Sequence, residues 1–238
     1  KNTAVGAEAL DANTTGSENA AVGAQSLKNN TSGARNSVLG AFAMRDNSSG
    51  VDNTAMGHNS MLENSTGKEN TGIGAGALQM NSSGDSNTAV GYMALKGSMS
   101  AAMAQNVAIG SAAMKAADAS VTSNVYIGNR AGAIGNGTIQ NNVVIGHDAH
   151  SNSASGWDNV YIGKDNSQSS TGNSNVAIGS SASANGVNSV SVGRGAGGGG
   201  DYNVALGSAS FQKLTSGDFN VGLGHFTGDK VNSGDNNV

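Results

Sequence analysis

The chain contains no cysteine and no proline, and only 4% of its 238 residues are aromatic. The lack of cysteine excludes disulfide bonds and thiolate chemistry. Large aliphatic side chains are also too sparse for one deep and compact core, so apolar burial must be thin and spread along the chain. Charged residues are also scarce, at 12%, whereas disordered proteins usually carry high charge. A repeating fold is consistent with the low content of both large apolar and charged residues.

Two further absences exclude classes of partner. The net charge is −4, so the chain lacks the excess of basic residues that nucleic-acid binding requires. No run of residues approaches 18 apolar positions, so we expect no membrane insertion by this segment.

A five-residue motif, Asn-(Thr/Val)-x-(Val/Ile/Leu)-Gly, recurs along the whole sequence. Residues 1–96 carry regular 17-residue repeats, whereas residues 97–238 carry repeats of variable length with loop insertions, so that the intervals between motif glycines run from 14 to 19 residues. Asparagine opens every motif but one, where Ser189 replaces it. The motif glycines are Gly6, Gly23, Gly40, Gly57, Gly74, Gly91, Gly110, Gly128, Gly146, Gly163, Gly179, Gly193, Gly207 and Gly224.

The pentad has the residue pattern of a short β-strand. Its second and fourth positions share one face of an extended chain, and the fourth is always aliphatic. The third position, on the opposite face, is usually Ala or Gly, although Tyr126 and Tyr161 are exceptions. Both faces are therefore restricted, which predicts a strand that packs on each side.

The residues between pentads predict a second short strand and a turn. A small residue followed by Leu or Met comes after the motif glycine, as in Ala9-Leu10 and Ala43-Met44. A turn of the form Asn-(Thr/Ser)-(Thr/Ser)-Gly follows, for example at 30–33. Residues 98–105 and 111–120, which are rich in Ala and Met, allow a turn or two of helix. Stacked asparagines at each repeat start are expected to form hydrogen-bonded ladders.

These units predict an all-β fold, a parallel β-roll (β-solenoid) with coils of 14–19 residues. One unit cannot bury its own apolar face, but stacked coils share a continuous thin core. We expect residues 1–238 to form a single repeat array. The repeats begin at residue 2 and stop within a motif at residue 238, without a capping sequence, so we expect a fragment of a longer fibre.

Three segments carry a resemblance to a known family. Asn-Val-Ala-Ile-Gly-Ser-Ala-Ala (106–113), Asn-Val-Ala-Ile-Gly-Ser-Ser-Ala (175–182) and Ser-Val-Ser-Val-Gly-Arg-Gly-Ala (189–196) resemble the head repeats of trimeric autotransporter adhesins, and the two 14-residue intervals match that family's period. The 17-residue variant is similar to repeats of phage tail fibres. The resemblance implies a left-handed roll, a homotrimer around a common axis, and a location that is extracellular, on the cell surface or on a virion. In such a trimer we expect the small third-position residues to face the neighbouring chains.

Three aromatic residues are the candidate binding residues. Trp157, the single tryptophan, lies in a polar loop at 151–158, and Tyr126 and Tyr161 replace small residues at the third motif position. Exposed aromatic rings have an apolar face suited to stacking on sugar rings, which predicts glycan contact. The competing interpretation is local packing inside a wider coil.

The histidines suggest a metal-binding site as a hypothesis to weigh. His58, His147 and His225 each follow a motif glycine, so a trimer would bring three copies of each together, and imidazole is a good ligand for transition metals. Asp148 and His150 lie beside His147 in the sequence. Because other residues at the position after the glycine are mostly small or polar, we favour solvated loop residues and expect no metal and no cofactor.

No catalytic constellation is expected, because Ser and Asp occur in turns shared by all repeats whereas a catalytic site is singular. The sequence therefore predicts a non-catalytic structural or adhesive segment of an elongated homotrimeric surface fibre, from a phage tail fibre or a bacterial adhesin. It would attach to a glycan or protein receptor on a host surface. One alternative is an ice-binding solenoid, based on the paired hydroxyls at 14–15, 31–32, 48–49 and 65–66. Another is a solenoid enzyme that processes polysaccharides.

Overall fold

The computed structural model describes residues 1–97, 103–115, 120–132, 138–150, 156–166 and 172–238. The fold is all-β, and its paired strands run parallel in a β-solenoid, as the sequence predicts. The described residues include no helix; of the two segments in which helical turns are expected, 103–104 is strand, 111–115 is turn, and 98–102 and 116–119 lie outside the described residues. The chain divides into two compact units, residues 1–123 and 124–238.

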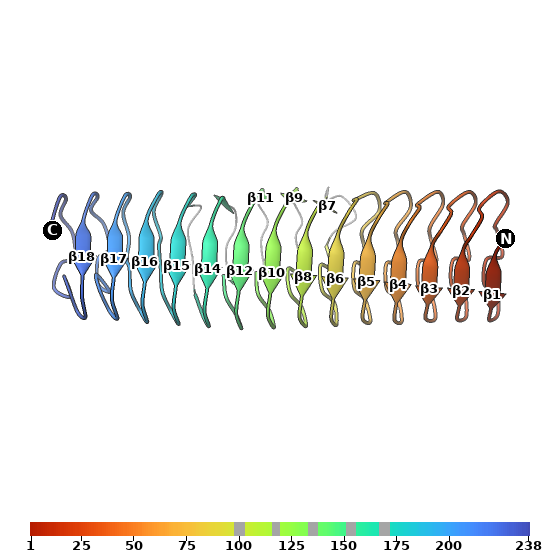
Figure 1. Ribbon diagram of the computed structural model, residues 1–238, viewed down its shortest axis with the longest axis horizontal. Coiled ribbons are helices and arrows are strands. Elements are labelled where there is room, and N and C mark those ends of the chain that lie inside the picture. The colour runs from red at the N-terminus through yellow and green to blue at the C-terminus, as the bar shows by residue number, and fades with distance from the viewer. Residues whose placement is uncertain (98–102, 116–119, 133–137, 151–155, 167–171) are drawn as a thin grey trace. The chain divides into compact units, whose positions relative to one another are not determined.

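In the first unit, seven pentads form one parallel sheet in chain order (Figure 1). Its strands are β1 (Thr3–Val5), β2 (Ala20–Val22), β3 (Ser37–Leu39), β4 (Thr54–Met56), β5 (Thr71–Ile73), β6 (Thr88–Val90) and β8 (Val107–Ile109). Two further strands, β7 (Met103–Ala104) and β9 (Val121–Thr122), pair with each other. Equivalent repeat positions face each other, for example Ala4 and Ala21, so every column of the sheet contains one motif position.

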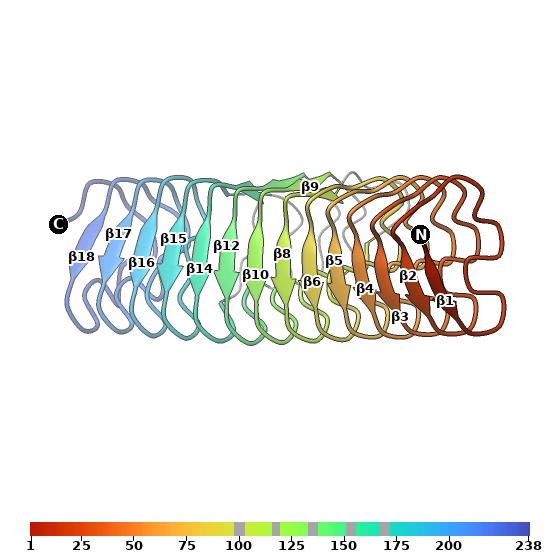
Figure 2. The ribbon, with the colours of Figure 1, turned by 45° about the vertical axis from the view of Figure 1, so that its right-hand side comes forward.

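The second unit repeats this arrangement with coils of variable length. Its main sheet contains β10 (Val125–Ile127), β12 (Val143–Ile145), β14 (Val160–Ile162), β15 (Val176–Ile178), β16 (Val190–Val192), β17 (Val204–Leu206) and β18 (Val221–Leu223). The short strands β11 (Ile139–Gln140) and β13 (Gly156–Trp157) pair with each other outside the main sheet. Within each unit, the turn segments of successive coils lie side by side in the same order as the strands (Figure 2).

The predicted second strand after the motif glycine is wrong. These residues form a turn in which two positions have left-handed backbone, as in Gln25 (φ 56°) and Leu27 (φ 49°). Strand residues do not adopt positive φ, so no strand forms, although Leu27 N–H still donates to the Ala43 carbonyl of the next coil at 3.1 Å. The extra short strands precede the pentad instead, as β7, β9, β11 and β13 do.

The interior of each coil lies between the third pentad position and the turn. Ala21 and Ala55 are fully buried, and so are the turn residues Leu27 and Met44, which follow the glycine by four positions. The expectation that the small third-position residues face neighbouring chains is therefore wrong. The coil closes over that face with its own Leu and Met side chains, and a small residue at the third position leaves them room.

In two coils, a bulky core residue in one of these two rows packs against a glycine in the other row. Where Phe211 occupies the turn position, the third pentad position is Gly222, and a Cβ there would lie 2.6 Å from the phenyl ring. Where Tyr126 occupies the third position, the turn position is Gly132, and a Cβ there would lie 1.9 Å from the tyrosine ring. In these two coils a glycine lies against the bulky residue, because the interior is close-packed.

The predicted asparagine ladder is confirmed. The Asn53 amide group donates to Asn36 Oδ1 of the preceding coil at 3.0 Å and to the Gly67 carbonyl at 2.8 Å, which closes the turn of its own coil. The backbone N–H of Asn70 in turn donates to Asn53 Oδ1 at 3.0 Å. A second ladder runs through the turn asparagines of the first unit, where Asn47 donates to Asn30 Oδ1 at 2.6 Å. These amides satisfy backbone groups that would otherwise be buried without a partner.

The one motif without asparagine keeps the ladder connected. Ser189 N–H donates to Asn175 Oδ1 at 2.9 Å, and Asn203 N–H donates to Ser189 Oγ at 3.1 Å. The hydroxyl therefore replaces the amide oxygen as acceptor.

The part of the chain that the structure describes contains no helix long and apolar enough to cross a lipid bilayer.

Candidate functional site

The outer face of the first unit's sheet carries a column of aliphatic side chains. The fourth pentad positions point away from the coil interior, and several are markedly exposed, with Val5 at 57%, Leu39 at 48% and Met56 at 40%. The second positions beside them are Thr, Ser, Ala or Val, and no charged residue occurs at either position. This face is therefore flat, weakly polar and uncharged.

The outer face of the second unit is more apolar. Each of its seven strands in the main sheet begins with Val and ends with Ile, Val or Leu, and both ends point outward. Ile178 is 36% exposed, Leu206 38% and Leu223 64%. Contiguous exposed apolar surface of this kind marks an interaction site in soluble proteins. Each unit thus presents one apolar sheet face that no other described residues of that unit cover.

A shallow hollow lies on this face in the first unit. Its volume is about 250 Å³, and it runs across β2, β3 and β4. The hollow is lined by Ala20, Val22, Ser37, Val38, Leu39, Thr54 and Met56. Its small residues, at the second pentad position, form one column beside a column of larger residues at the fourth position.

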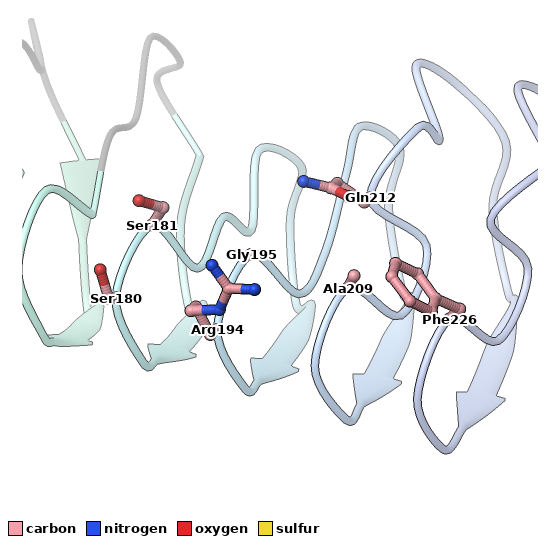
Figure 3. A pocket seen from close by; sticks show the side chains of 7 residues that line it. All are labelled: Ser180, Ser181, Arg194, Gly195, Ala209, Gln212 and Phe226. Carbon is pink, nitrogen blue, oxygen red and sulfur yellow. The ribbon is translucent and has the colours of Figure 1, made fainter.

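A second, more polar hollow lies over the turns of the second unit, with a volume of about 340 Å³ (Figure 3). It arises at the position two residues after the motif glycine, where three successive coils carry only small residues. These are Ser181, Gly195 and Ala209, followed in the next coil by Phe226. These small side chains leave the hollow open, and Phe226 bounds it at one end. The lining residues are Ser180, Ser181, Arg194, Gly195, Ala209, Gln212 and Phe226.

A smaller hollow forms in the same way in the first unit. Gly76 lacks a side chain between Asn59 and Met93 of the neighbouring coils, and the resulting space of about 170 Å³ is also lined by His58 and Tyr92. The ring of His58 meets that of Phe42 edge-on, with centroids 5.7 Å apart. Both hollows therefore lie where the residue two positions after the glycine is small and a larger residue bounds the row.

The three predicted glycan-contact residues lie in different environments. Tyr126 and Tyr161 are 1% and 0% exposed, because the third pentad position points into the coil. Both rings fill the interior, so their predicted exposure is wrong and the packing interpretation is confirmed for them. Trp157, on β13, is 49% exposed, and the loop before it at 151–155 lies outside the described residues.

Sequence reasoning missed four exposed aromatic residues. Tyr92, Tyr202, Phe219 and Phe226 are each about half exposed, at 55%, 48%, 54% and 53%. Tyr202 and Phe219 stack with centroids 4.9 Å apart and planes inclined by 5°. Both directly precede the motif asparagine in consecutive repeats. This shared position in the repeat could have identified the stacked pair from the sequence.

The surface histidines occupy separate coils. His147 Nδ1 and carboxylate oxygens of Asp148 and Asp165 lie within 4.8 Å of one another. Both carboxylates already have cationic partners, because Arg130 lies 3.0 Å from Asp148 and Lys164 lies 3.3 Å from Asp165. A bound metal ion would have to displace these side chains.

His58 and His225, the other two histidines of the metal hypothesis, lie at the surface against aromatic rings. The ring of His225 packs on Phe226 with centroids 4.0 Å apart, and its Nδ1 lies 3.1 Å from the Ser208 carbonyl oxygen. Neither histidine belongs to a cluster of metal-ligating side chains among the described residues.

His150 is the one buried histidine. It occupies the turn position that holds Leu27 and Met44 in other coils, it is 3% exposed, and its ring stacks on Tyr161 at 4.4 Å. Burial lowers the pKa of His150 from its ordinary value of 6.5 to about 4. The ring is therefore neutral in the folded chain at pH 7.

This burial predicts a loss of stability in mild acid. The folded chain binds the His150 proton less well than the unfolded chain, so stability is complete above pH 6.5 and falls as the pH drops towards 4. At pH 5 the expected loss is about 2 kcal/mol. Thermal unfolding of the wild type and of His150→Leu at pH 7 and pH 5 measures it. The variant should lose much less stability between the two pH values, and an equal loss in both proteins would contradict the assignment to His150.

The paired hydroxyls of the turns serve two purposes. The first of each pair bonds to the next coil, as Thr14 Oγ1 does with the Thr31 carbonyl at 2.8 Å and Thr31 Oγ1 with the Ser48 carbonyl at 2.8 Å. The second of each pair, such as Thr15 and Ser32, is exposed. Half of the hydroxyl array behind the ice-binding alternative is thus engaged within the coil stack.

The geometry leaves two kinds of candidate surface, the apolar outer face of the sheet and the hollows over the turns. Neither contains a clustered set of carboxylates. Comparison of the chain with models of protein families, with curated proteins and with solved structures finds no match.

Proposed function

We propose that this chain is a non-catalytic module of an elongated homotrimeric surface fibre, located outside the cell or on a virion, that attaches to a host or other surface. The observation that carries the proposal is the uncharged apolar outer face of each unit's sheet, which no other described residues of that unit cover. Burial of such a face is favourable at roughly 25 cal/mol per Å². A chain that exposes it along many coils gains most by covering it with a partner.

The partner that fits best is another copy of the same chain. The outer face consists of columns that repeat once per coil, at the spacing of neighbouring strands, roughly 4.8 Å. A partner that covers the face along its length must share this period, and a second copy does. The number of three chains comes from the resemblance of the 14-residue repeats to trimeric adhesin heads.

Further support for a non-catalytic role comes from the hollows. The three hollows described above are lined by small, apolar, aromatic, amide, hydroxyl, imidazole or cationic side chains and by no carboxylate. A polysaccharide-cleaving solenoid needs paired carboxylic acids in its groove. The turns instead offer aromatic and polar contacts that suit binding.

Light scattering coupled to size exclusion tests the assembly. The expected mass is three times the chain mass of 23.3 kDa. A double variant, Ile73→Asp with Ile178→Asp, places one carboxylate on the outer face of each unit and should yield monomers, because a buried unpaired charge is costly. The matched control, Ser49→Asp with Ser83→Asp, adds the same charge at exposed turn positions and should remain trimeric. A wild-type protein that is monomeric at high concentration would refute the proposal.

A further inference from the structure

We propose that the polar hollow over the turns of residues 179–226 binds a carboxylate-bearing sugar residue of a surface glycan, with Arg194 holding the carboxylate and Phe226 supporting the sugar ring. The inference rests on the attachment function proposed above and names a ligand class for it. It does not involve Trp157, Tyr126 or Tyr161.

The charge of the hollow selects an anion. Arg194 is its one charged lining residue. Among the described residues the Arg194 guanidinium has no ion-pair partner, whereas Arg35, Arg45 and Arg130 each lie against an aspartate. The stretches of residues 124–238 that the structure leaves undescribed contain no Asp or Glu. An unpaired guanidinium offers a planar fork of donors that matches a carboxylate in a bidentate geometry.

The neutral polar groups add donors around this cation. Ser180 and Ser181 lie on the coil before Arg194, and Gln212 reaches over from the coil after it (Figure 3). No hydrogen bond within the described chain engages these three side chains. Hydroxyl and amide groups can each both donate and accept, as required for the hydroxyl groups of a sugar.

The aromatic end of the hollow provides an apolar support. Phe226 is 53% exposed and contributes its ring to the lining, while His225 packs against it at 4.0 Å. One face of a pyranose ring presents C–H groups, which pack on an aromatic face in the manner that exposed aromatic residues at interfaces use. A cation and an aromatic ring separated by two coils, roughly 10 Å, suit a sugar that carries its carboxylate on one side of the ring.

Ligand-observed NMR and calorimetry on the intact chain test the inference. The probes are the methyl glycosides of N-acetylneuraminic acid and galacturonic acid, with methyl galactoside as the neutral comparison. At least one acidic probe should bind roughly tenfold more tightly than the neutral sugar, since a charge-assisted hydrogen bond is stronger than a neutral one. Arg194→Gln should abolish this preference, and Phe226→Ala should weaken binding of acidic and neutral sugars alike.

Two controls make the result decisive. Lys68→Gln removes one positive charge from an exposed site outside the hollow and should bind like the wild type. Inorganic phosphate at the concentration of the sugar should displace it only in part. Equal binding of neutral and acidic sugars, an unaffected Arg194→Gln variant, or full displacement by phosphate would each overturn the inference. The same samples analysed by light scattering show whether the trimer persists, so failure of the sugar site is distinguished from failure of the fibre proposal.

Discussion

Replacing Gly74 by alanine is expected to cost more than about 4 kcal/mol of stability, an exceptional effect for one methyl group. Gly74 has φ +130°, which side-chain-bearing residues rarely adopt. A Cβ there would lie 2.4 Å from the Gly91 carbonyl oxygen of the next coil. The two coils cannot separate to relieve this clash, because Gly91 N–H donates to the Ile73 carbonyl at 2.7 Å. Urea unfolding followed by circular dichroism measures the loss.

The control for this prediction lies two residues further along the same coil. Gly76 also has positive φ, +67°, but a Cβ there would meet nothing closer than 3.5 Å. Asn59 occupies the same place in the preceding coil with φ 56°. Gly76→Asn should therefore change stability by less than about 1 kcal/mol. Equal losses in the two variants would show that the contact with Gly91 is not the cause.

Replacing Asn53 by alanine should cost about 3 kcal/mol or more. The side chain is 1% exposed and serves three neighbours at once. Its removal leaves the buried backbone N–H of Asn70 without a bond, which costs about 1–3 kcal/mol. Asn36 Oδ1 and the Gly67 carbonyl each lose one bond and keep another, from the residue 53 N–H and from the Asn64 amide. The same unfolding measurement applies, with hydrogen exchange at the Asn70 amide as a local readout.

An exposed asparagine provides the comparison for Asn53. Asn29 lies at the surface and donates to the Asp46 carboxylate at 2.8 Å. Water replaces that bond at little cost, so Asn29→Ala should change stability by less than about 0.5 kcal/mol. A small loss for Asn53→Ala, similar to that for Asn29→Ala, would mean that the ladder contributes little to the fold.

The strands and the ladder could be predicted from the sequence, because both depend on local patterns that every repeat carries. The alternation within a pentad such as Asn53–Gly57 defines a strand, and a polar residue at each repeat start must find a partner in the next coil. The orientation of the strand could not be predicted in this way. Both faces of a pentad are uncharged, so the choice of Gly72 as the inward residue of β5 depends on Met61, which packs against it from the turn.

The turns and the candidate sites could not be predicted from the sequence, for a different reason. Left-handed backbone at Gln25 and Leu27 has no signal in residue type, since neither is Gly, Asn or Asp. The tightness of the coil imposes that backbone. Likewise, the hollow beside Arg194 exists because small residues coincide in three successive coils. These residues can be aligned in the sequence by their distance from the motif glycine, but the hollow that they form depends on the turn backbone, which the sequence does not indicate.

The coil-to-coil register has a consequence for how such chains change over time. In the first unit each 17-residue coil offers the same bonding groups to the coil before it and the coil after it, as Asn36, Asn53 and Asn70 illustrate. Duplication of one coil's coding segment would therefore insert a coil between two existing ones with every bond remade, and deletion would do the reverse. The number of coils can therefore change by simple recombination. The turn residues that differ from coil to coil can change independently of that number.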